Sequence, residues 1–161
     1  MSPEELVNLS LHYEVEIEAH TTIHPKDLLT FSFRGCAPLK ISRVPLYVAL
    51  HLRSLNLCTI RTLYCLTKDF LSSLIEKEKS ETNFVELPDC LFELGHFFSN
   101  HEVESSLCEL KRIRRTKIWK GLKSLDGKAI CINGMTKWEF NELKDFIIDS
   151  MEFGKRIETD E

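Results

Sequence analysis

The sequence has few of the residues that mark low-complexity, membrane-spanning or secreted chains. Its 161 residues include only six glycines and five prolines, too few for a collagen-like or disordered composition. No apolar run approaches the roughly 18 residues that a membrane-spanning helix requires. The first ten residues, MSPEELVNLS, have neither the basic start nor the apolar centre of a secretory signal. We therefore expect a soluble chain made in the cytosol, of about one domain's length and without membrane contact.

Residue patterns typical of metal sites and enzymes are also missing. The six cysteines are widely spaced and include no C-x-x-C pair, which argues against structural zinc and favours reduced, partly buried thiols. There is no Gly-rich phosphate loop, no G-x-S-x-G and no H-E-x-x-H motif. Cys90, His96 and His101 could be assembled into a metal site, but no zinc spacing rule selects them. The sequence therefore predicts no enzyme, no cofactor and no metal.

The overall charge argues against binding of nucleic acid by the whole molecule. The chain has 21 Lys and Arg residues against 25 Asp and Glu residues, a formal net charge of −4, whereas such binders are normally basic. Its hydrophobic content of 43% and charged content of 29% are typical of a globular protein. A nucleic-acid contact would therefore need a local basic patch.

The first forty-odd residues have the pattern of β structure. Apolar and polar residues alternate over 9–19, as in a half-buried strand, and we interpret the three glutamates of the polar face as a solvated surface. Further β-rich pieces lie at 28–33 and 39–44, on either side of a Gly-Cys-Ala-Pro break. We predict a small β-rich module over residues 1–43, too small to be stable by itself.

From Pro45 onward the apolar spacing changes to that of helices. Five helices are predicted, over about 45–57, 67–80, 88–100, 102–125 and from 136 onward. The first is apolar on more than one side, which indicates burial from several directions. The last opens on a capping box formed by Thr136 and Glu139. The expected fold is α+β and mainly α, with the β module followed by an antiparallel five-helix domain over 44–161.

The strongest local charge feature is a basic stretch over residues 111–123. Seven of its thirteen residues are Lys or Arg, and such a stripe could meet phosphates or an acidic protein surface. A solvated face of an amphipathic helix explains it equally well. Only Trp119 is interleaved, so the stacking platform of a single-strand binder is missing. The candidate residues for a partner or DNA patch are Lys111, Arg112, Arg114, Arg115 and Lys117.

The predicted helices also carry more apolar side chains than one buried stripe requires. A surplus of this kind on a short helical chain indicates an obligate protein interface. The candidate interface residues are Pro45, Leu46, Tyr47, Leu50, Leu52, Leu55, Phe92, Phe97, Trp119, Trp138 and Phe140.

Five segments follow one another in a fixed order: VPLYVALHL at 44–52, a Lys/Glu-rich run at 76–81, residues 88–101, residues 110–122, and MTKWEFN at 135–141. Together they resemble the Psf-two family of subunits of the eukaryotic GINS replication complex. The run VPLYVALHL at 44–52 resembles the family's V-P-L-W-x-A-x-x-L helix opening, and the Lys/Glu-rich run at 76–81 its second helix. Residues 88–101 resemble its proline-led aromatic helix, and 110–122 its long basic helix. The run MTKWEFN at 135–141 resembles the L-T-x-x-E-I-N opening of the last helix.

The resemblance implies a non-catalytic scaffold in a nuclear heterotetramer with the three other GINS subunits, acting in initiation and elongation of DNA replication. It implies further partners in the replicative helicase assembly, namely the MCM ring and the Cdc-forty-five protein. Polymerase epsilon would be reached through the complex, and any contact with DNA would be indirect or weak. The residues alone leave a different reading open, a free-standing helical module that binds nucleic acid through residues 111–123.

Overall fold

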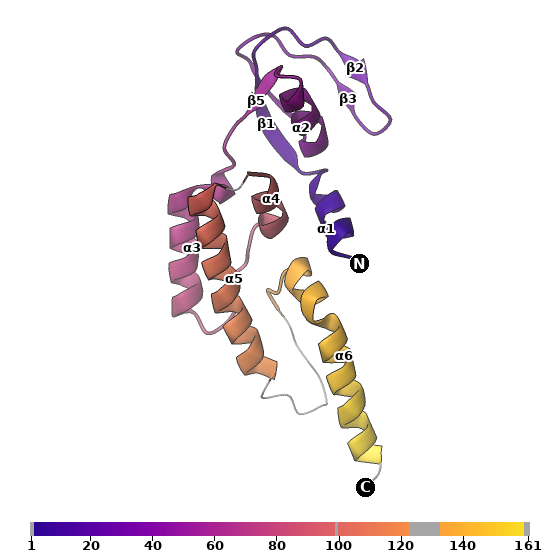
Figure 1. The fold of residues 1–161 in the computed structure, drawn as a ribbon, viewed down its shortest axis with the longest axis vertical. Helices are drawn as coiled ribbons and strands as arrows, with labels where there is room; N and C mark the ends of the chain where they lie inside the picture. The colour runs from indigo at the N-terminus through magenta and orange to yellow at the C-terminus, as the bar shows by residue number, and fades with distance from the viewer. Residues whose placement is uncertain (1, 99, 123–132, 160–161) are drawn as a thin grey trace. The chain divides into compact units, whose positions relative to one another are not determined.

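The computed structural model describes residues 2–98, 100–122 and 133–159 (Figure 1). The chain divides into two compact units, residues 7–63 and residues 1–6 together with 64–161. The predicted class, α+β and mainly α, is confirmed: the described residues form six α-helices, a three-stranded sheet and a two-stranded ribbon. None of the described helices is long and apolar enough to span a membrane.

The unit of residues 7–63 is built on a three-stranded antiparallel sheet. The strands are β1 (Glu14–Ala19), β4 (Ile41–Pro45) and β5 (Cys58–Ile60), in the order β4-β1-β5. Val15, Ile17 and Ala19 of β1 are buried, because alternate side chains of a strand point to the same face. On the opposite face Glu16 forms ion pairs with Arg43 and Arg61, so the glutamate face is a charged surface.

Helix α2 (Leu46–Ser54) follows β4 directly and packs against the sheet. Its buried residues are Leu46, Val48, Ala49 and Leu52. A separate ribbon of β2 (Lys26–Asp27) and β3 (Ser32–Phe33) extends from this unit. Gly35 at its base has a φ of +83°, and a Cβ there would lie 2.8 Å from the carbonyl oxygen of Ile23, so the turn requires glycine.

The first helix was not predicted, because the alternating pattern over 9–19 indicated a strand. Residues 9–13 are expected as strand, but α1 (Pro3–Ser10) continues into this segment and β1 begins only at Glu14. The helix starts with a capping box in which the Ser2 N–H donates to Glu5 Oε2 (2.7 Å) and the Glu5 N–H donates to Ser2 Oγ (3.2 Å). Pro3 suits the first helical position. The strand prediction over 9–13 is therefore wrong, since the helix that starts at this capping box extends to Ser10 and turn residues follow it.

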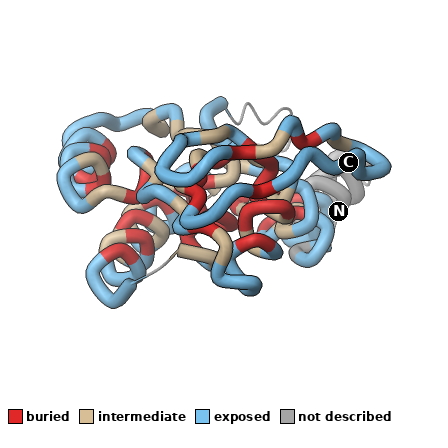
Figure 2. The backbone as a smooth tube through the Cα atoms, turned by 90° about the horizontal axis from the view of Figure 1, so that it is seen from above, coloured by how far each residue is buried: buried red, intermediate tan, exposed pale blue. Residues whose placement is uncertain are grey.

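The remaining helices match the five predictions to within a few residues where they are described. In the larger unit a 3₁₀ turn (Tyr64–Leu66) precedes α3 (Lys68–Ser80), α4 (Leu91–Phe98), α5 (His101–Leu122) and α6 (Lys137–Thr159). Buried positions recur at helical spacing along α3 and α5, and Figure 2 shows the buried residues of the chain in red. At Gly95 an added Cβ would lie 2.3 Å from Leu107 Cδ1, so α4 packs closely on α5. The predicted end of the fourth helix, residues 123–125, lies outside the described residues.

Helices α5 and α6 run in the same direction (Figure 1). Lys111 contacts Trp138, Arg115 pairs with Glu142 and Trp119 packs on Phe146, each pair 27 residues apart. A constant offset of this kind requires parallel helices. The antiparallel arrangement is therefore wrong for this pair. The physical reason is that Glu139 pairs with Arg114, which attaches the first turn of α6 to the middle of α5 rather than to its end.

Candidate interaction surface on the last two helices

A fully buried arginine, Arg114, lies on α5 in the larger unit. Arg114 donates from Nε to Glu139 Oε1 (2.6 Å) and from Nη2 to Glu139 Oε2 (3.0 Å) and to the Gly134 carbonyl (2.6 Å). Its Nη1 donates to Glu78 Oε2 (2.9 Å) and to the Val85 carbonyl (3.0 Å). All five N–H groups that a guanidinium carries are therefore used.

The charges around Arg114 balance. Lys117 donates to Glu78 Oε1 (2.6 Å), so two cations face two carboxylates, Glu78 and Glu139, in what we call the Arg114 network. Burial by itself lowers the pKa of Arg114, but the hydrogen bonds and charges of Glu139 and Glu78 outweigh it and raise that pKa above its ordinary value. Buried ions are tolerated only when paired and hydrogen-bonded. The guanidinium is therefore held charged inside the helical unit.

The predicted capping box at the start of α6 is confirmed, and it belongs to the same network. The Thr136 N–H donates to Glu139 Oε2 (2.9 Å), and the Glu139 N–H donates to Thr136 Oγ1 (3.3 Å). The carboxylate that caps α6 is therefore also the carboxylate that holds Arg114. Consequently the first turn of α6 is fixed to the middle of α5 by side-chain chemistry as well as by packing.

Arg114 is expected from the sequence to be a surface cation, and this is wrong, because its side chain is fully buried. The signal was present in the spacing. Leu107, Leu110 and Ile118 form the buried stripe of α5, and Arg114 occupies the position of that stripe four residues before Ile118. Glu78 likewise continues the buried stripe of α3. Opposite charges that fall within two apolar stripes indicate a buried pair.

The other cations of the basic stretch differ in how freely they face solvent. Lys117 is 17% exposed and pairs with Glu78, and Arg115 pairs with Glu142. Lys111 Nζ lies 5.0 Å from the ring centre of Phe92 and 4.9 Å from that of Trp138. Arg112 is exposed and has no carboxylate within 4 Å among the described residues. The stretch is therefore no continuous cationic face of the kind that a free-standing nucleic-acid module would use; Lys123 lies outside the described residues.

The predicted interface residues fall into three groups by burial. Pro45, Leu46, Leu52 and Phe92 are buried within this chain, so the structure corrects their assignment to a subunit surface: their side chains complete the chain's own core. Tyr47, Leu50, Phe97 and Trp138 are partly buried, and Leu55, Trp119 and Phe140 are exposed. The structure therefore does not bring the eleven residues together on one surface.

Two exposed apolar residues of α6 were missed by the sequence analysis. Phe146 and Ile148 are 47% and 52% exposed. Phe146 packs edge-on against Trp119 of α5, with ring centres 5.4 Å apart. Because Phe146 and Ile148 are two residues apart, they lie on opposite sides of α6 and flank the buried residues Leu143 and Ile147. Phe140 of the same helix is exposed as well. Such residues are candidates for protein contact.

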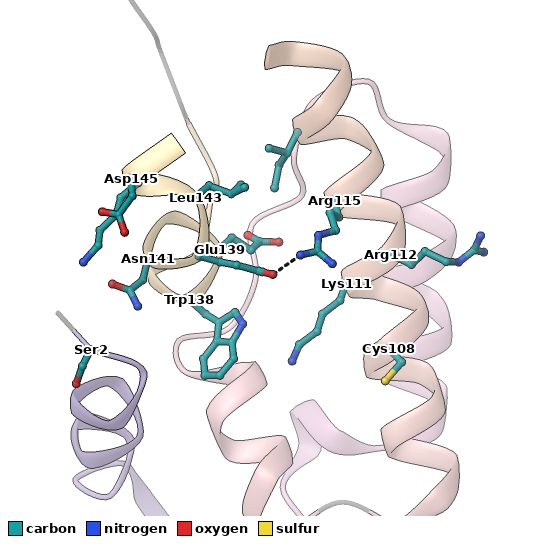
Figure 3. Close-up of a pocket in the computed structure, with 13 residues that line it drawn as sticks. Ser2, Cys108, Lys111, Arg112, Arg115, Trp138, Glu139, Asn141, Leu143 and Asp145 are labelled. Carbon is teal, nitrogen blue, oxygen red and sulfur yellow. Dashed lines mark hydrogen bonds and ion pairs between the residues drawn. The ribbon is translucent and has the colours of Figure 1, made fainter. Parts of the chain in front are cut away.

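A groove of about 710 Å³ lies between α5 and α6 (Figure 3). We call it the α5–α6 groove. From α5 it is lined by Cys108, Lys111, Arg112, Arg115 and Ile118, and from α6 mainly by Trp138, Glu142, Leu143, Lys144 and Asp145. It thus combines aromatic and aliphatic side chains with charges of both signs. Elsewhere in the described part of the chain, no three His, Cys, Asp or Glu side chains are grouped to hold a metal, and Cys90, His96 and His101 form no such group.

Comparison with known proteins extends these observations. The Sld5 family model, described as the GINS complex protein helical bundle domain, matches residues 65–158, which contain α3 to α6 almost entirely. The chain is 38% identical to the probable DNA replication complex GINS protein PSF2 of Encephalitozoon cuniculi, over 98% of this chain and 95% of that protein. It is 29% identical to the DNA replication complex GINS protein PSF2 of Candida albicans, covering 94% and 80% of the two chains. It is 30% identical to the DNA replication complex GINS protein PSF2 of Saccharomyces cerevisiae, over 75% of this chain and 62% of that protein.

Proposed function

The chain belongs to the GINS family of DNA replication complex proteins, as a PSF2-type subunit, and we propose that it acts as a non-catalytic scaffold in a heterotetramer with the three other GINS subunits. The observation that carries this proposal is the similarity to a PSF2 protein over 98% of the chain. Because the similarity extends over both compact units, the proposal applies to the whole chain and not to the helical bundle alone.

The charges of α5 support a scaffold role. Of the five candidate patch residues, Arg114, Arg115 and Lys117 are engaged in ion pairs that join helices of this chain. Lysines and arginines used in this way give shape and rigidity to the bundle, and contribute less to phosphate binding than free cations do. These three residues of the basic stretch therefore act as internal support.

The exposed apolar residues of α5 and α6 support protein contact. Trp119, Phe140, Phe146 and Ile148 are each between 42% and 52% exposed. Burying apolar area contributes about 25 cal/mol per Å², and aromatic residues are enriched at protein interfaces. We propose that these residues contact sister subunits, together with Leu55 and the accessible parts of Tyr47 and Leu50.

We propose further that the assembled tetramer joins the MCM ring and the Cdc-forty-five protein in the replicative helicase in the nucleus, and contacts polymerase epsilon. In this arrangement the sheet of the smaller unit, residues 7–63, faces helicase partners, and the exposed residues of α2 and of the last two helices face sister subunits. Contact with DNA is indirect or weak.

The test is co-expression with three candidate sister subunits, followed by size-exclusion chromatography with light scattering. We expect a stable 1:1:1:1 species, and self-association of the chain when it is expressed alone, because its apolar surface is then uncovered. Phe140→Ser should weaken the assembly, whereas Leu29→Ser, which changes an exposed leucine of the smaller unit, should not. A well-behaved monomer that ignores the sister subunits would overturn the proposal.

A further inference from the structure

We propose that the α5–α6 groove binds an acidic segment of a sister subunit, which places a carboxylate at Lys111 and an apolar side chain against Trp138. The inference rests on the proposed function, since it names the chemistry of one contact within that assembly.

The geometry of Lys111 is the first observation. Its ammonium group lies between two aromatic rings, 5.0 Å from the centre of Phe92 and 4.9 Å from that of Trp138. Figure 3 shows Lys111 reaching from α5 toward Trp138 on the groove wall formed by α6. Aromatic faces stabilise a cation but do not neutralise it. Among the described residues Glu93 is near enough for the charge of Lys111 to lower its pKa, but no carboxylate lies within 4 Å of this ammonium, so a partner's carboxylate can still pair with it directly.

The charge balance of the groove is the second observation. Arg115 is paired with Glu142 across the groove, and Glu139 is held by the Arg114 network. Three lining cations, Lys111, Arg112 and Lys144, have no carboxylate within 4 Å in the described part of the chain. Only one lining anion, Asp145, has no cation within 4 Å among the same residues. The groove therefore has a positive excess, and a negatively charged occupant is electrostatically complementary to it.

The mixture of side chains favours protein over nucleic acid. Asp145 lies in the lining of the groove, where it repels a continuous chain of phosphates, whereas a polypeptide can place acidic residues at Lys111 and Arg112 and a neutral or basic residue at Asp145. Trp138 and the buried side chains of Ile118 and Leu143 give the groove an apolar part. Interface pockets combine an aromatic anchor with charged groups at the rim in this manner.

The chain carries its own probes of the groove. Cys108 lines it and is exposed, whereas burial raises the pKa of Cys58, Cys65 and Cys90 and so lowers their thiolate fraction. Alkylation, which proceeds through the thiolate, should therefore modify Cys108 before these three. The chain has two tryptophans, Trp119 on α5 and Trp138 on α6. Their fluorescence therefore reports on the region of the groove.

The experiment uses the full chain in the co-expressed tetramer. We expect alkylation of Cys108, followed by mass spectrometry, to be at least about tenfold slower than in the chain unfolded by guanidinium chloride. A zero-length carbodiimide cross-link should join Lys111 to an Asp or Glu of a sister subunit. Lys111→Met should remove the cross-link and weaken assembly by about tenfold, and Lys111→Arg should restore the affinity. Lys120→Glu, an exposed charge change on the same helix, is the matched control.

The outcomes separate the two proposals. If no tetramer forms, the proposed function fails. If the tetramer forms but Cys108 reacts as fast as in the unfolded chain, or Lys111 cross-links to no sister carboxylate, the groove is not the docking site while the scaffold role stands. If duplex DNA changes the tryptophan fluorescence and protects Cys108 in the tetramer, the occupant is nucleic acid and the inference is overturned.

Discussion

Arg114 and Glu139 form a bidentate ion pair that is closed to solvent, with Nε to Oε1 at 2.6 Å and Nη2 to Oε2 at 3.0 Å. The arginine lies in the middle of α5 and the glutamate in the first turn of α6. The same glutamate closes the capping box with Thr136. One carboxylate thus sets both where α6 begins and where it attaches.

Replacing Arg114 should therefore be costly. Arg114→Met leaves Glu78 and Glu139 buried without their main counter-charge, and removing one partner of a buried pair typically costs about 3–5 kcal/mol. We expect a lower melting temperature of the co-expressed complex and faster hydrogen exchange in the first turns of α6. Arg112→Met, which removes an exposed cation two residues earlier, should change stability by no more than about 0.5 kcal/mol. Equal effects of the two substitutions would contradict the role assigned to Arg114.

The pair should also show energetic coupling. Glu139→Gln keeps a side chain that can complete a capping box but removes the charge that Arg114 requires. In a double-mutant cycle, Arg114→Met combined with Glu139→Gln should be less destabilised than the sum of the single variants, by about 1–3 kcal/mol. The quantity to measure is the free energy of unfolding of the four proteins. Strict additivity would mean that the two side chains act independently.

Glu93 should make stability depend on pH. Burial raises the pKa of this carboxyl above its ordinary 4.5, although a backbone hydrogen bond and Lys111 and Lys137 partly oppose the shift. A raised pKa in the folded state means that the stabilising contribution is complete below the ordinary pKa and is lost as pH rises through the folded value. Glu93→Gln should therefore unfold at a higher temperature than the parent at pH 7 and at the same temperature near pH 4.

Glu109→Gln is the control with the opposite sign. The hydrogen bond and charge of Lys79 hold the pKa of Glu109 below its ordinary value, so its contribution is present above that value and declines as pH falls. Thermal unfolding between pH 4 and 8 would distinguish the two variants. Parallel curves for parent and Glu93→Gln across this range would contradict the assignment to Glu93.

The contact between α4 and α5 should be sensitive to one methyl group. In Gly95→Ala the new Cβ would lie 2.3 Å from Leu107 Cδ1, and Leu107 is itself buried. Overpacking of this kind costs about 1–3 kcal/mol. Gly121→Ala places a Cβ where no atom lies within 4 Å and should stabilise the helix by up to about 1 kcal/mol. Both effects can be read from chemical denaturation, and a stable Gly95→Ala variant would show that the helices can separate.

Much of the fold followed from short-range patterns. The helical period from Pro45 onward predicted α2 to α6, and Thr136 and Glu139 marked the start of the last helix. These predictions succeeded because capping and amphipathic spacing involve residues within one or two turns of each other. The same reasoning failed at residues 9–13, where an alternating pattern overlapped a helix that Ser2 and Glu5 had already started.

The candidate site was less predictable, because it depends on residues far apart in the chain. Glu78, Arg114 and Glu139 are 36 and 25 residues from one another. A sequence read in short windows treats each as a surface charge. Four of the eleven proposed interface residues are likewise buried in the chain's own core, since apolar spacing alone does not distinguish an internal contact from an external one.

The sequence by itself determined the secondary structure of the helical part, the start of α6 and the family to which the chain belongs, because local propensities and ordered motifs are properties of neighbouring residues. Only the tertiary structure decided that α6 runs parallel to α5, that Arg114 is an internal ion and that Lys111 lies against Trp138 in a groove. The physical reason is desolvation. Whether a charge costs or contributes free energy depends on which groups surround it after packing, and those groups come from distant parts of the chain.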